Sequence, residues 1–597
     1  MLTSPEILVI ATIILLFVLI FATRLKTELI ALIVLLVLTI SGLVTPDDAL
    51  SGFSSTVVIT LLGLFVITDA LEKTGVVQWV ADRLHSIGRG SQLRTMALFM
   101  GTGAALSLIM NNVAAGAVLL PAAVNVARTS DMPVSKLLLP MSFGTLVGGM
   151  ATYLTTANIL MSELLITRGY AGLSMLDFIP TGSVIVVAAV LYMVLIGQRL
   201  LPERSSLTQS FNHPDLKETY HLTDRLWHLR VLDGSRLAGQ TIGASAINAE
   251  LGLTIAAIWR TDETITIPKS DQMLYAGDEL LIVGREGRIH DLTGWGTAIL
   301  DAEIDPDHND LPIEPIEIII APRSEAIGRT LSDMRLNSDA GLLSLALWRD
   351  AESYHTDVRK MPLQVGDAVL VIGESDDIQN LANNPNYILP AGEYSTRTLR
   401  RDKAPYALGI TALVLGLGIA NVLSLPIAML AGAVAMVVTG CMTMPQFYEA
   451  ISWRVIFLVA GMLPLSFAIT ESGLADRIGA GVVLLLAGAH PLLLIAGMVI
   501  LTTLVVQIIG GQVSALLVGP IAINAALQTQ LDPRVMAVAV AMACSMAFLT
   551  PIAHPVNILI MGPGGYRFKD FFVIGIGMTI VTLLAMLLGL SLFWGVR

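Results

Sequence analysis

The sequence predicts an α-helical polytopic membrane protein, built as an inverted repeat of five crossings plus one re-entrant hairpin each, with a soluble insert of two small α+β domains. Three observations predict this fold class. The 597-residue chain is 54% hydrophobic and only 14% charged, with a mean hydropathy of +0.74. Its apolar runs recur in the same order in both halves. A polar, acidic stretch from 203 to 404 separates the two sets.

Charge is distributed unevenly along the chain. Residues 203–404 hold 19 Lys or Arg and 32 Asp or Glu, a net charge of −13, whereas the rest holds 16 basic and 15 acidic residues. An acidic insert in a neutral body excludes a nucleic-acid-binding surface, which would be basic. The two cysteines, Cys441 and Cys544, are too few for a disulfide framework or a zinc cluster.

The apolar runs form two sets. Each set predicts three spans, a pair of runs joined by a polar tip, an interrupted run and a last span. In the first set the paired arms have only about 15 residues, short of the ~20 that cross a bilayer, which predicts a re-entrant hairpin. An amphipathic stretch at 77–84 is typical of a helix on the membrane surface. The runs lie at 7–22, 28–44, 56–71, 95–127, from 137 onward and 181–198, and at 405–422, 425–441, 453–470, 491–527, 535–561 and 572–594.

The two sets match at a nearly constant spacing. Asn158-Ile159-Leu160 recurs as Asn557-Ile558-Leu559, 399 positions later, and Pro121 has Pro520 at the same offset. Gly63 and Gly461 are separated by 398 positions. A near-constant offset across several features indicates an internal duplication, as in many secondary transporters.

Counting the crossings predicts the topology. Five crossings per half is an odd number, so the second half is inverted relative to the first. Basic residues surround the first hairpin and flank the insert, which predicts that this hairpin opens to the cytoplasm, that the insert at 203–404 is cytoplasmic and that both termini are external. These residues are Lys73, Arg83, Arg89, Arg94, Arg128 and Lys136, and, beside the insert, Arg199, Arg204, Arg397, Arg400, Arg401 and Lys403.

The insert has a repeat of its own, with an offset of 89. Trp259-Arg260 recurs as Trp348-Arg349, and Gly277-Asp278 as Gly366-Asp367. We interpret the Gly-Asp pairs as turns, the tryptophans as core residues and the arginines as solvated. No Gly-x-Gly-x-x-Gly motif follows a strand, so no dinucleotide site is supported. The predicted domains are 1–202 (membrane repeat 1), 203–300, 301–404 and 405–597 (membrane repeat 2).

The tips of the two paired runs are the first candidate site. An unpaired amide in hydrocarbon costs several kcal/mol, so Asn111 and Asn112, with Val113 next to them, need partners. They form either a turn between two packed helices or a hairpin tip with a substrate or ion site. In the second half Gly510-Gly511-Gln512 lies at this place. Its glycines allow backbone N–H groups to approach an oxyanion, or allow tight helix packing.

The two interrupted runs are the second candidate site. The first break contains Thr155, Thr156 and Asn158, whose oxygens are plausible ligands. The second contains Thr550, Pro551, His554 and Asn557. His554 could carry a proton near neutral pH or act as a neutral hydrogen-bond donor. The two asparagines are either ligands or structural groups that bond backbone freed at the breaks.

These features together resemble the divalent anion:sodium symporter family of the ion-transporter superfamily. The resemblance rests on the tip Asn111-Asn112-Val113 followed by Pro121, on the break ending in Thr156-Ala157-Asn158, and on the stretch 550–568. The insert resembles two tandem TrkA C-terminal (RCK-C) domains, found in one branch of that family. Together these cover nearly the whole chain.

The resemblance implies a homodimer in which each protomer has a scaffold and a moving transport domain, with elevator-type alternating access. In the family, a Ser-Asn-Thr-type triplet at each hairpin tip binds sodium and anion. Asn111-Asn112-Val113 matches this triplet with valine in place of a hydroxyl residue, and Asn111 and Asn112 would hold the sodium ion. Gly510-Gly511-Gln512 has no asparagine, which marks the second sodium site as altered.

The sequence therefore predicts a cation-coupled symporter of a small divalent anion, sulfate ahead of dicarboxylates, in the cell inner (plasma) membrane. No cofactor is predicted; the coupling ion is Na⁺ or H⁺, and a small ligand could regulate the RCK-C-like domains. A cation/proton antiporter or metalloid exporter would need a buried carboxylate at a break, and neither break has one. An RCK-regulated ion channel would need a filter sequence that the chain lacks. No nucleophile–base pair or metal cluster indicates an enzyme.

Overall fold

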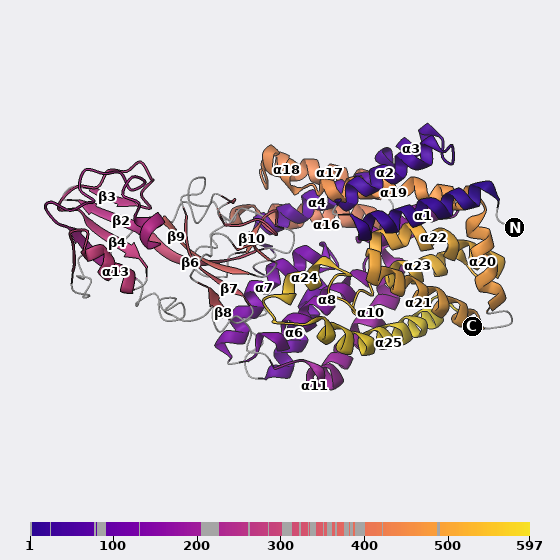
Figure 1. Cartoon of the computed structure of the whole chain (residues 1–597). Coiled ribbons are helices and arrows are strands. Elements are labelled where there is room, and N and C mark those ends of the chain that lie inside the picture. Colours follow the sequence, from indigo (N-terminus) through magenta and orange to yellow (C-terminus); the bar gives the residue numbers. More distant parts are fainter. Residues whose placement is uncertain are drawn as a thin grey trace. The chain divides into compact units, whose positions relative to one another are not determined.

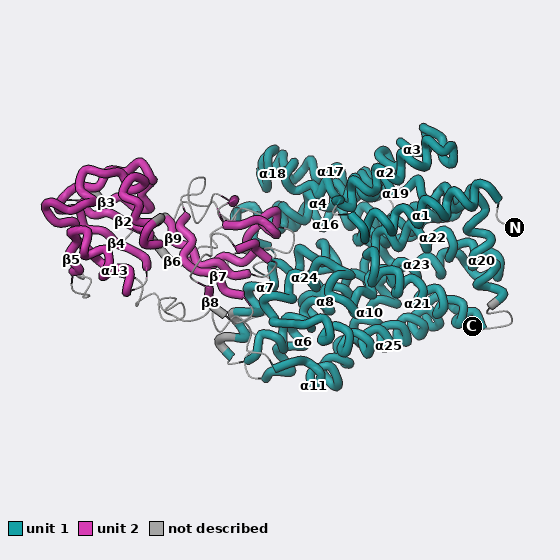
Figure 2. Tube along the Cα trace, in the orientation of Figure 1, with its two compact units in different colours: residues 1–204, 397–597 teal, residues 205–396 magenta. Residues whose placement is uncertain are grey.

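The computed structural model divides into two compact units, residues 1–204 with 397–597 and residues 205–396 (Figure 2). It describes residues 3–596 except for the following, of which nothing is said: 24, 77–78, 80–90, 131, 204–225, 261–262, 285, 301–312, 321–323, 332, 335–341, 350–351, 355–360, 365–366, 375–380, 382–385, 389–399, 421 and 486–489. The predicted surface helix at 77–84, apart from Trp79, lies outside the described residues, as do Arg83, Arg89, Arg204, Arg397 and Gly366.

The first unit is helical in both of its halves (Figure 1). The first half contains α1 (Ser4–Ala22), α2 (Thr27–Ile40), α3 (Pro46–Ser51), α4 (Thr56–Lys73), α6 (Gln92–Leu106), α7 (Asn112–Thr129), α8 (Leu138–Met150), α9 (Thr156–Ile166), α10 (Met175–Tyr192) and α11 (Gln198–Leu200). The second half contains α16 (Ala404–Ile419), α17 (Leu425–Val438), α18 (Met444–Ala450), α19 (Trp453–Glu471), α20 (Leu474–Leu485), α21 (Pro491–Ile509), α22 (Gly511–Gln528), α23 (Pro533–Ala543), α24 (Pro555–Met561) and α25 (Phe568–Phe593).

Local sequence explains where these helices begin. Thr3 and Glu6 form a capping box at α1, and Thr443 and Gln446 form another at α18. At α23 the Asp532 side chain accepts a backbone N–H, and proline follows at the first helical position. Such caps satisfy N–H groups that a helix leaves without an internal partner.

The polytopic fold is confirmed. Within the described residues, eight helices are long and apolar enough to cross a membrane, and six shorter apolar helices accompany them. The paired runs differ from expectation in length. α6 has 15 residues as expected, but α7 has 18, and α21 and α22 have 19 and 18, so three of the four arms are close to the length of a full crossing. Re-entrance of the two pairs stays a prediction.

The two halves interlock through one helix crossing that occurs twice. α4 packs on α17, where a Cβ on Gly63 would lie 2.6 Å from the backbone carbonyl of Met429. α19 packs on α2, where a Cβ on Gly461 would lie 3.1 Å from the backbone of Ala31. Both glycines and both partners are 398 positions apart, so each half supplies one helix to each crossing. A Cβ would clash at Gly63, whereas at Gly461 it would require a shift of a few tenths of an ångström.

The second unit contains two five-stranded antiparallel sheets of identical topology. The first has the order β3-β2-β4-β1-β5 and the second β10-β6-β9-β7-β8, which is the same order read in reverse. Both carry a register irregularity at the same position of the repeat, between Ile255 and Ala257 and between Ser344 and Ala346. The strands are β1 (Leu226–Val231), β2 (Thr254–Arg260), β3 (Glu263–Thr266), β4 (Glu279–Val283), β5 (Thr297–Ile299), β6 (Ile313–Ile320), β7 (Leu343–Arg349), β8 (Glu352–Tyr354), β9 (Ala368–Glu374) and β10 (Tyr387–Ile388).

One interpretation of the insert is wrong. Arg260 and Arg349 are not simply solvated, because each forms a two-pronged ion pair with a carboxylate that is only 2% exposed. Arg260 holds Asp278 through Nε and Nη2, both at 2.8 Å, and Arg349 holds Asp367 at 2.8 and 2.6 Å. A buried carboxylate requires such a partner, and the planar guanidinium matches its two oxygens. The aspartate of each Gly-Asp turn therefore also holds the arginine side chain in place.

Candidate functional site

The tip of the first helix pair is a turn between α6 and α7. Ser107 ends α6, and α7 begins at Asn112. The side-chain oxygen of Asn111 accepts the N–H of Val113 at 2.9 Å, as a helix-capping residue does. Asn112 is buried, and its amide lies against the position that a Cβ on Gly149 would take, at 2.8 Å. Asn112 therefore contacts the broken helix α8–α9.

The first break lies between α8 and α9, and its polar side chains bond the freed backbone. Thr155 caps α9 by accepting the N–H of Asn158 at 3.4 Å. The amide nitrogen of Asn158 donates to the carbonyls of Gly149 and Thr152. The hydroxyl of Thr152 donates to the carbonyl of Leu108 at 2.8 Å, which ties the break to the hairpin tip. Thr156, the first residue of α9, is partly exposed.

At the first tip and break, three buried side-chain oxygens have no hydrogen-bond partner among the described residues: Ser107 Oγ, Asn112 Oδ1 and Asn158 Oδ1. All three residues lie at the hairpin tip or the break, and both asparagines contact Gly149. Buried acceptors are rarely left without a partner unless an ion or water takes the place. Hydroxyl and amide oxygens are ligands that a small hard cation prefers.

The tip of the second pair is built by glycine. Gly510 has φ +78° and ends α21 by donating its N–H to Val506 O at 3.0 Å. A Cβ on Gly511 would lie 2.3 Å from the carbonyl oxygen of Cys544, so this glycine permits tight packing. Gln512 is partly buried in the first turn of α22. The first turn of an 18-residue helix presents N–H groups without intrahelical partners, which favour an anion.

The second break, between α23 and α24, repeats the first. Thr550 Oγ1 donates to the carbonyl of Gln507 at 3.4 Å and accepts the N–H of Ala553 at 3.2 Å. The buried Pro551 follows it, and His554 caps α24 by accepting the N–H of Val556 at Nδ1. The helix cap at His554 is the counterpart of Thr155, 399 positions earlier.

Both the amide nitrogen and the amide oxygen of Asn557 are hydrogen-bonded inside the protein. Its amide nitrogen donates to the carbonyls of Ala547 at 2.7 Å and Thr550 at 3.4 Å. Its oxygen accepts the hydroxyl of Ser142 at 2.7 Å, a contact from α8 in the other half of the chain. α8 contacts α24, and α9 contacts α23, so the two breaks are adjacent.

Sequence reasoning missed Gln507, in the last turn of α21. Its amide nitrogen donates to the carbonyls of Met546 at 2.8 Å and Thr503 at 3.1 Å, and its oxygen accepts the N–H of Leu549 at 3.2 Å. The signal was a lone glutamine inside an apolar run. Ser107 and Ser142 were also missed, because isolated serines are common in apolar helices.

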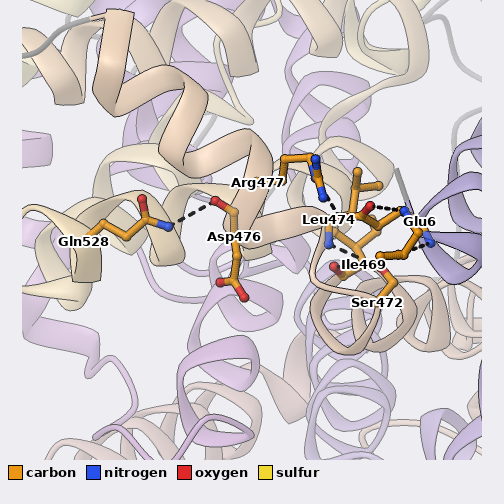
Figure 3. A network of polar contacts seen from close by, with 8 residues as sticks. Glu6, Ile469, Ser472, Leu474, Asp476, Arg477 and Gln528 are labelled. Carbon is orange, nitrogen blue, oxygen red and sulfur yellow. Dashed lines mark hydrogen bonds and ion pairs between the residues drawn. The ribbon is translucent and has the colours of Figure 1, made fainter. Parts of the chain in front are cut away.

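A separate polar network holds the ends of α20 and α22 (Figure 3). Arg477 of α20 pairs with Glu6 of α1 at 2.8 Å, and Glu6 also belongs to the capping box of that helix. Gln528 donates to the backbone carbonyl of Asp476 at 3.1 Å, and Asn524 donates to the Asp476 carboxylate. This network fixes the end of α22 that lies away from the glycine tip.

The polar groups of the candidate site are neutral ligands for ions and hydrogen-bonding solutes. Throughout the part of the chain that the structure describes, no three His, Cys, Asp or Glu residues gather in a way that could hold a metal ion. The polar groups at the tips and breaks are hydroxyls, amides, backbone groups and one histidine. Such a set can coordinate a hard cation and hydrogen-bond an anion.

Comparison with known proteins gives consistent matches. A family model described as citrate transporter (CitMHS) matches residues 17–510 and 472–596. The transporter sll0640 of Synechocystis sp. is 33% identical over 588 residues, 95% of this chain and 94% of that one. Sodium/sulfate cotransporter 2 of Chlamydomonas reinhardtii is 23% identical over 358 residues, 55% of this chain and 38% of that one. The crystal structure of the Alcanivorax borkumensis YdaH transporter aligns over 99% of both chains, with 12% identity and a TM-score of 0.43.

Proposed function

The chain belongs to the citrate transporter family, a divalent anion symporter-type family of multi-pass membrane proteins, and we propose that it is a sodium-coupled symporter of a small divalent anion. Proteins of this family are transporters, not enzymes. The observation that carries the proposal is the pairing of two hairpin tips with two broken helices. Buried oxygens without partners lie beside helix N-termini there.

The proposed anion site uses backbone N–H groups and neutral side chains. The first turns of α9 and α22 present N–H groups and the positive ends of helix dipoles. Gln512 and Thr156 offer donors nearby, whereas the remaining predicted residues (Val113, Thr155, Gly510, Gly511, Thr550, Pro551, His554, Asn557) shape the tips and breaks. A co-bound cation would offset part of the anion charge.

Sulfate is the favoured substrate, and dicarboxylates are second. A relative aligned over 55% of the chain is named a sodium/sulfate cotransporter. Sulfate suits a site built from hydrogen-bond donors without a basic side chain at either tip, because it accepts hydrogen bonds in all directions. Citrate, which the family description names, belongs in the competition panel.

Sodium is favoured over protons as the coupling ion. Asn111, Asn112, Asn158 and Ser107 supply the oxygens around which a sodium ion would bind. His554 is the alternative, as a proton carrier. Its Nδ1 accepts the N–H of Val556, so protonation of that nitrogen would break the cap of α24.

The proposal extends to the assembly. We place the protein in the inner (plasma) membrane as a homodimer with elevator-type alternating access. The 203–404 insert is then cytoplasmic, and its two units are RCK-C-like domains that bind a small regulatory ligand. The identical topology of the two sheets supports their origin by duplication.

Radiolabelled sulfate uptake into proteoliposomes tests the proposal, with sodium and pH gradients imposed separately. We expect uptake driven by the sodium gradient, inhibited by excess sulfate and less by succinate or citrate. Asn112→Ala and Gln512→Ala should both reduce it. The proposed site is wrong if both variants, folded as judged by size-exclusion profile and thermal midpoint, transport at the wild-type rate. Uptake driven only by a proton gradient would indicate proton coupling, with His554 as the proton carrier, in place of sodium coupling.

A further inference from the structure

The internal repeat allows the polar centres of the two halves to be compared position by position at the 399-residue offset. At the tip and break of the first half, the buried oxygens without a partner among the described residues belong to Ser107, Asn112 and Asn158. Their counterparts are a valine, a glycine and an asparagine: Val506, Gly511 and Asn557. Two of the three positions therefore have no side-chain oxygen in the second half.

The third counterpart has an oxygen, but a protein donor already occupies it. Asn557 Oδ1 accepts the Ser142 hydroxyl at 2.7 Å. The residue 399 positions after Ser142 is Ala541, which is fully buried in α23 and has no hydroxyl. α23 packs on α9, where Asn158 lies, just as α8 packs on α24. One serine–alanine difference therefore separates a satisfied amide oxygen from an unsatisfied one.

Gln507 closes the second centre further. Its amide nitrogen donates to the carbonyls of Thr503 and Met546, which a cation could otherwise coordinate. The amide is neutral and needs no counter-charge. The equivalent residue of the first half is Leu108, which cannot bond a carbonyl. At the second break, the oxygen of Asn557 and the carbonyls that Gln507 and Asn557 bind are thus already occupied by side-chain donors, and these acceptors do not fit a cation.

We infer that each protomer binds one cation, in the first half alone, and that Ser142 and Gln507 keep the second half closed by internal hydrogen bonds. This inference rests on the proposed sodium coupling and gives it a stoichiometry. The duplicated centres have diverged in role: the first binds the cation, and the second provides a fixed, preorganised backbone for the anion.

Sodium binding by the purified full-length protein in detergent tests this without transport. We expect equilibrium binding of ²²Na⁺ to saturate at one ion per protomer. The thermal midpoint should rise with sodium concentration along a curve of Hill coefficient one, because a ligand stabilises the state that binds it. Two ions per protomer would overturn the inference and leave sodium coupling intact. No sodium binding would overturn both, whereas sulfate uptake reports on anion transport independently.

A matched pair of variants sharpens the test. Ala541→Ser introduces a hydroxyl in α23, which packs on α9. We expect this hydroxyl to donate to Asn158 Oδ1 and sodium affinity to fall about tenfold, the effect of one competing hydrogen bond. Ser142→Ala frees the oxygen of Asn557, but Gln507 still occupies two carbonyls there and Val506 and Gly511 supply no oxygen, so sodium affinity and stoichiometry should stay unchanged. Wild-type sodium affinity in a folded Ala541→Ser protein would contradict the inference. If that variant fails to fold, Asn112→Ala serves instead, with complete loss of bound sodium expected; retained binding would contradict the inference.

Discussion

Asn158 in the first half and Asn557 in the second lie at the same point of a broken helix, and each amide nitrogen donates to two carbonyls near the break. Their oxygens differ. Asn557 Oδ1 accepts a serine hydroxyl from the other half, whereas no partner is found for Asn158 Oδ1 among the described residues. In both halves the amide nitrogen bonds the carbonyls freed at the break. The amide oxygen differs: it is bonded by serine in the second half and has no described partner in the first.

The same division holds at the two tips. The first tip has a buried asparagine side chain against Gly149, and the second has a glycine whose Cβ position is blocked by Cys544 O. The position equivalent to Gly149 is Phe548, which is fully buried and packs edge-on against Phe143. Polar volume in one half is thus replaced by apolar packing in the other. The comparison teaches that a duplicated backbone can be kept while its binding groups are redistributed.

The largest expected effect comes from removing the satisfied amide. Asn557→Ala leaves two carbonyls and the Ser142 hydroxyl without a partner, at an expected loss of about 4 kcal/mol in stability. Asn158→Ala leaves only two carbonyls and should cost about 3 kcal/mol. The thermal midpoints of the two purified variants, measured without sodium, show which substitution destabilises the protein more. Equal midpoints would show that the Ser142 contact contributes nothing.

A smaller effect is expected at the tips. Gly511→Ala drives a methyl group against the Cys544 carbonyl and should destabilise the protein by about 3 kcal/mol through overpacking. Asn112→Ala at the equivalent position should change the sodium-free midpoint little, because the described structure assigns its oxygen no partner, and should remove the sodium-dependent part. If Gly511→Ala unfolds at the same thermal midpoint as the wild type, the predicted clash with the Cys544 carbonyl is wrong.

Gln507→Leu makes the second half resemble the first at this position. It leaves the Met546 carbonyl and the Leu549 N–H unpaired, with an expected loss of about 2 kcal/mol. The reverse change, Leu108→Gln, is the control and should be close to neutral, since Leu108 is 39% exposed. Chemical denaturation followed by tryptophan fluorescence would compare them. A neutral Gln507→Leu would mean that water replaces the amide.

The smallest effect is expected at the two threonines that tie each break to its tip. Thr152→Val loses a 2.8 Å hydrogen bond to Leu108 O and should cost about 1 kcal/mol. Thr550→Val loses a bond of 3.4 Å and should cost about half as much. The ratio of the two shifts in thermal midpoint tests whether the first tip is held more tightly. The reverse order would contradict it.

Local sequence was enough to predict the polytopic fold and to place both breaks. A break inside an apolar run requires polar residues and proline at that point, as at Thr550-Pro551. Ser142 could not be predicted, because its partner Asn557 is 415 positions away and in the other half. Gln507 was visible as a polar residue in an apolar run, but its three partners lie partly on another segment. The solvated interpretation of Arg260 failed for the same reason: the buried Asp278 that holds it lies directly before the neighbouring strand β4.

The crossings at Gly63 and Gly461 have a consequence for biogenesis. α2 is covered by α19 and α4 by α17, so the first half emerges from the ribosome with two small-residue faces that only the second half can cover. The contacts of α2 and α4 with α19 and α17 can form only after the insert and the second half have been synthesised. A half-length ancestor would have made both crossings as an antiparallel pair of identical chains. A chain cut within the insert and expressed as two pieces should therefore reassemble.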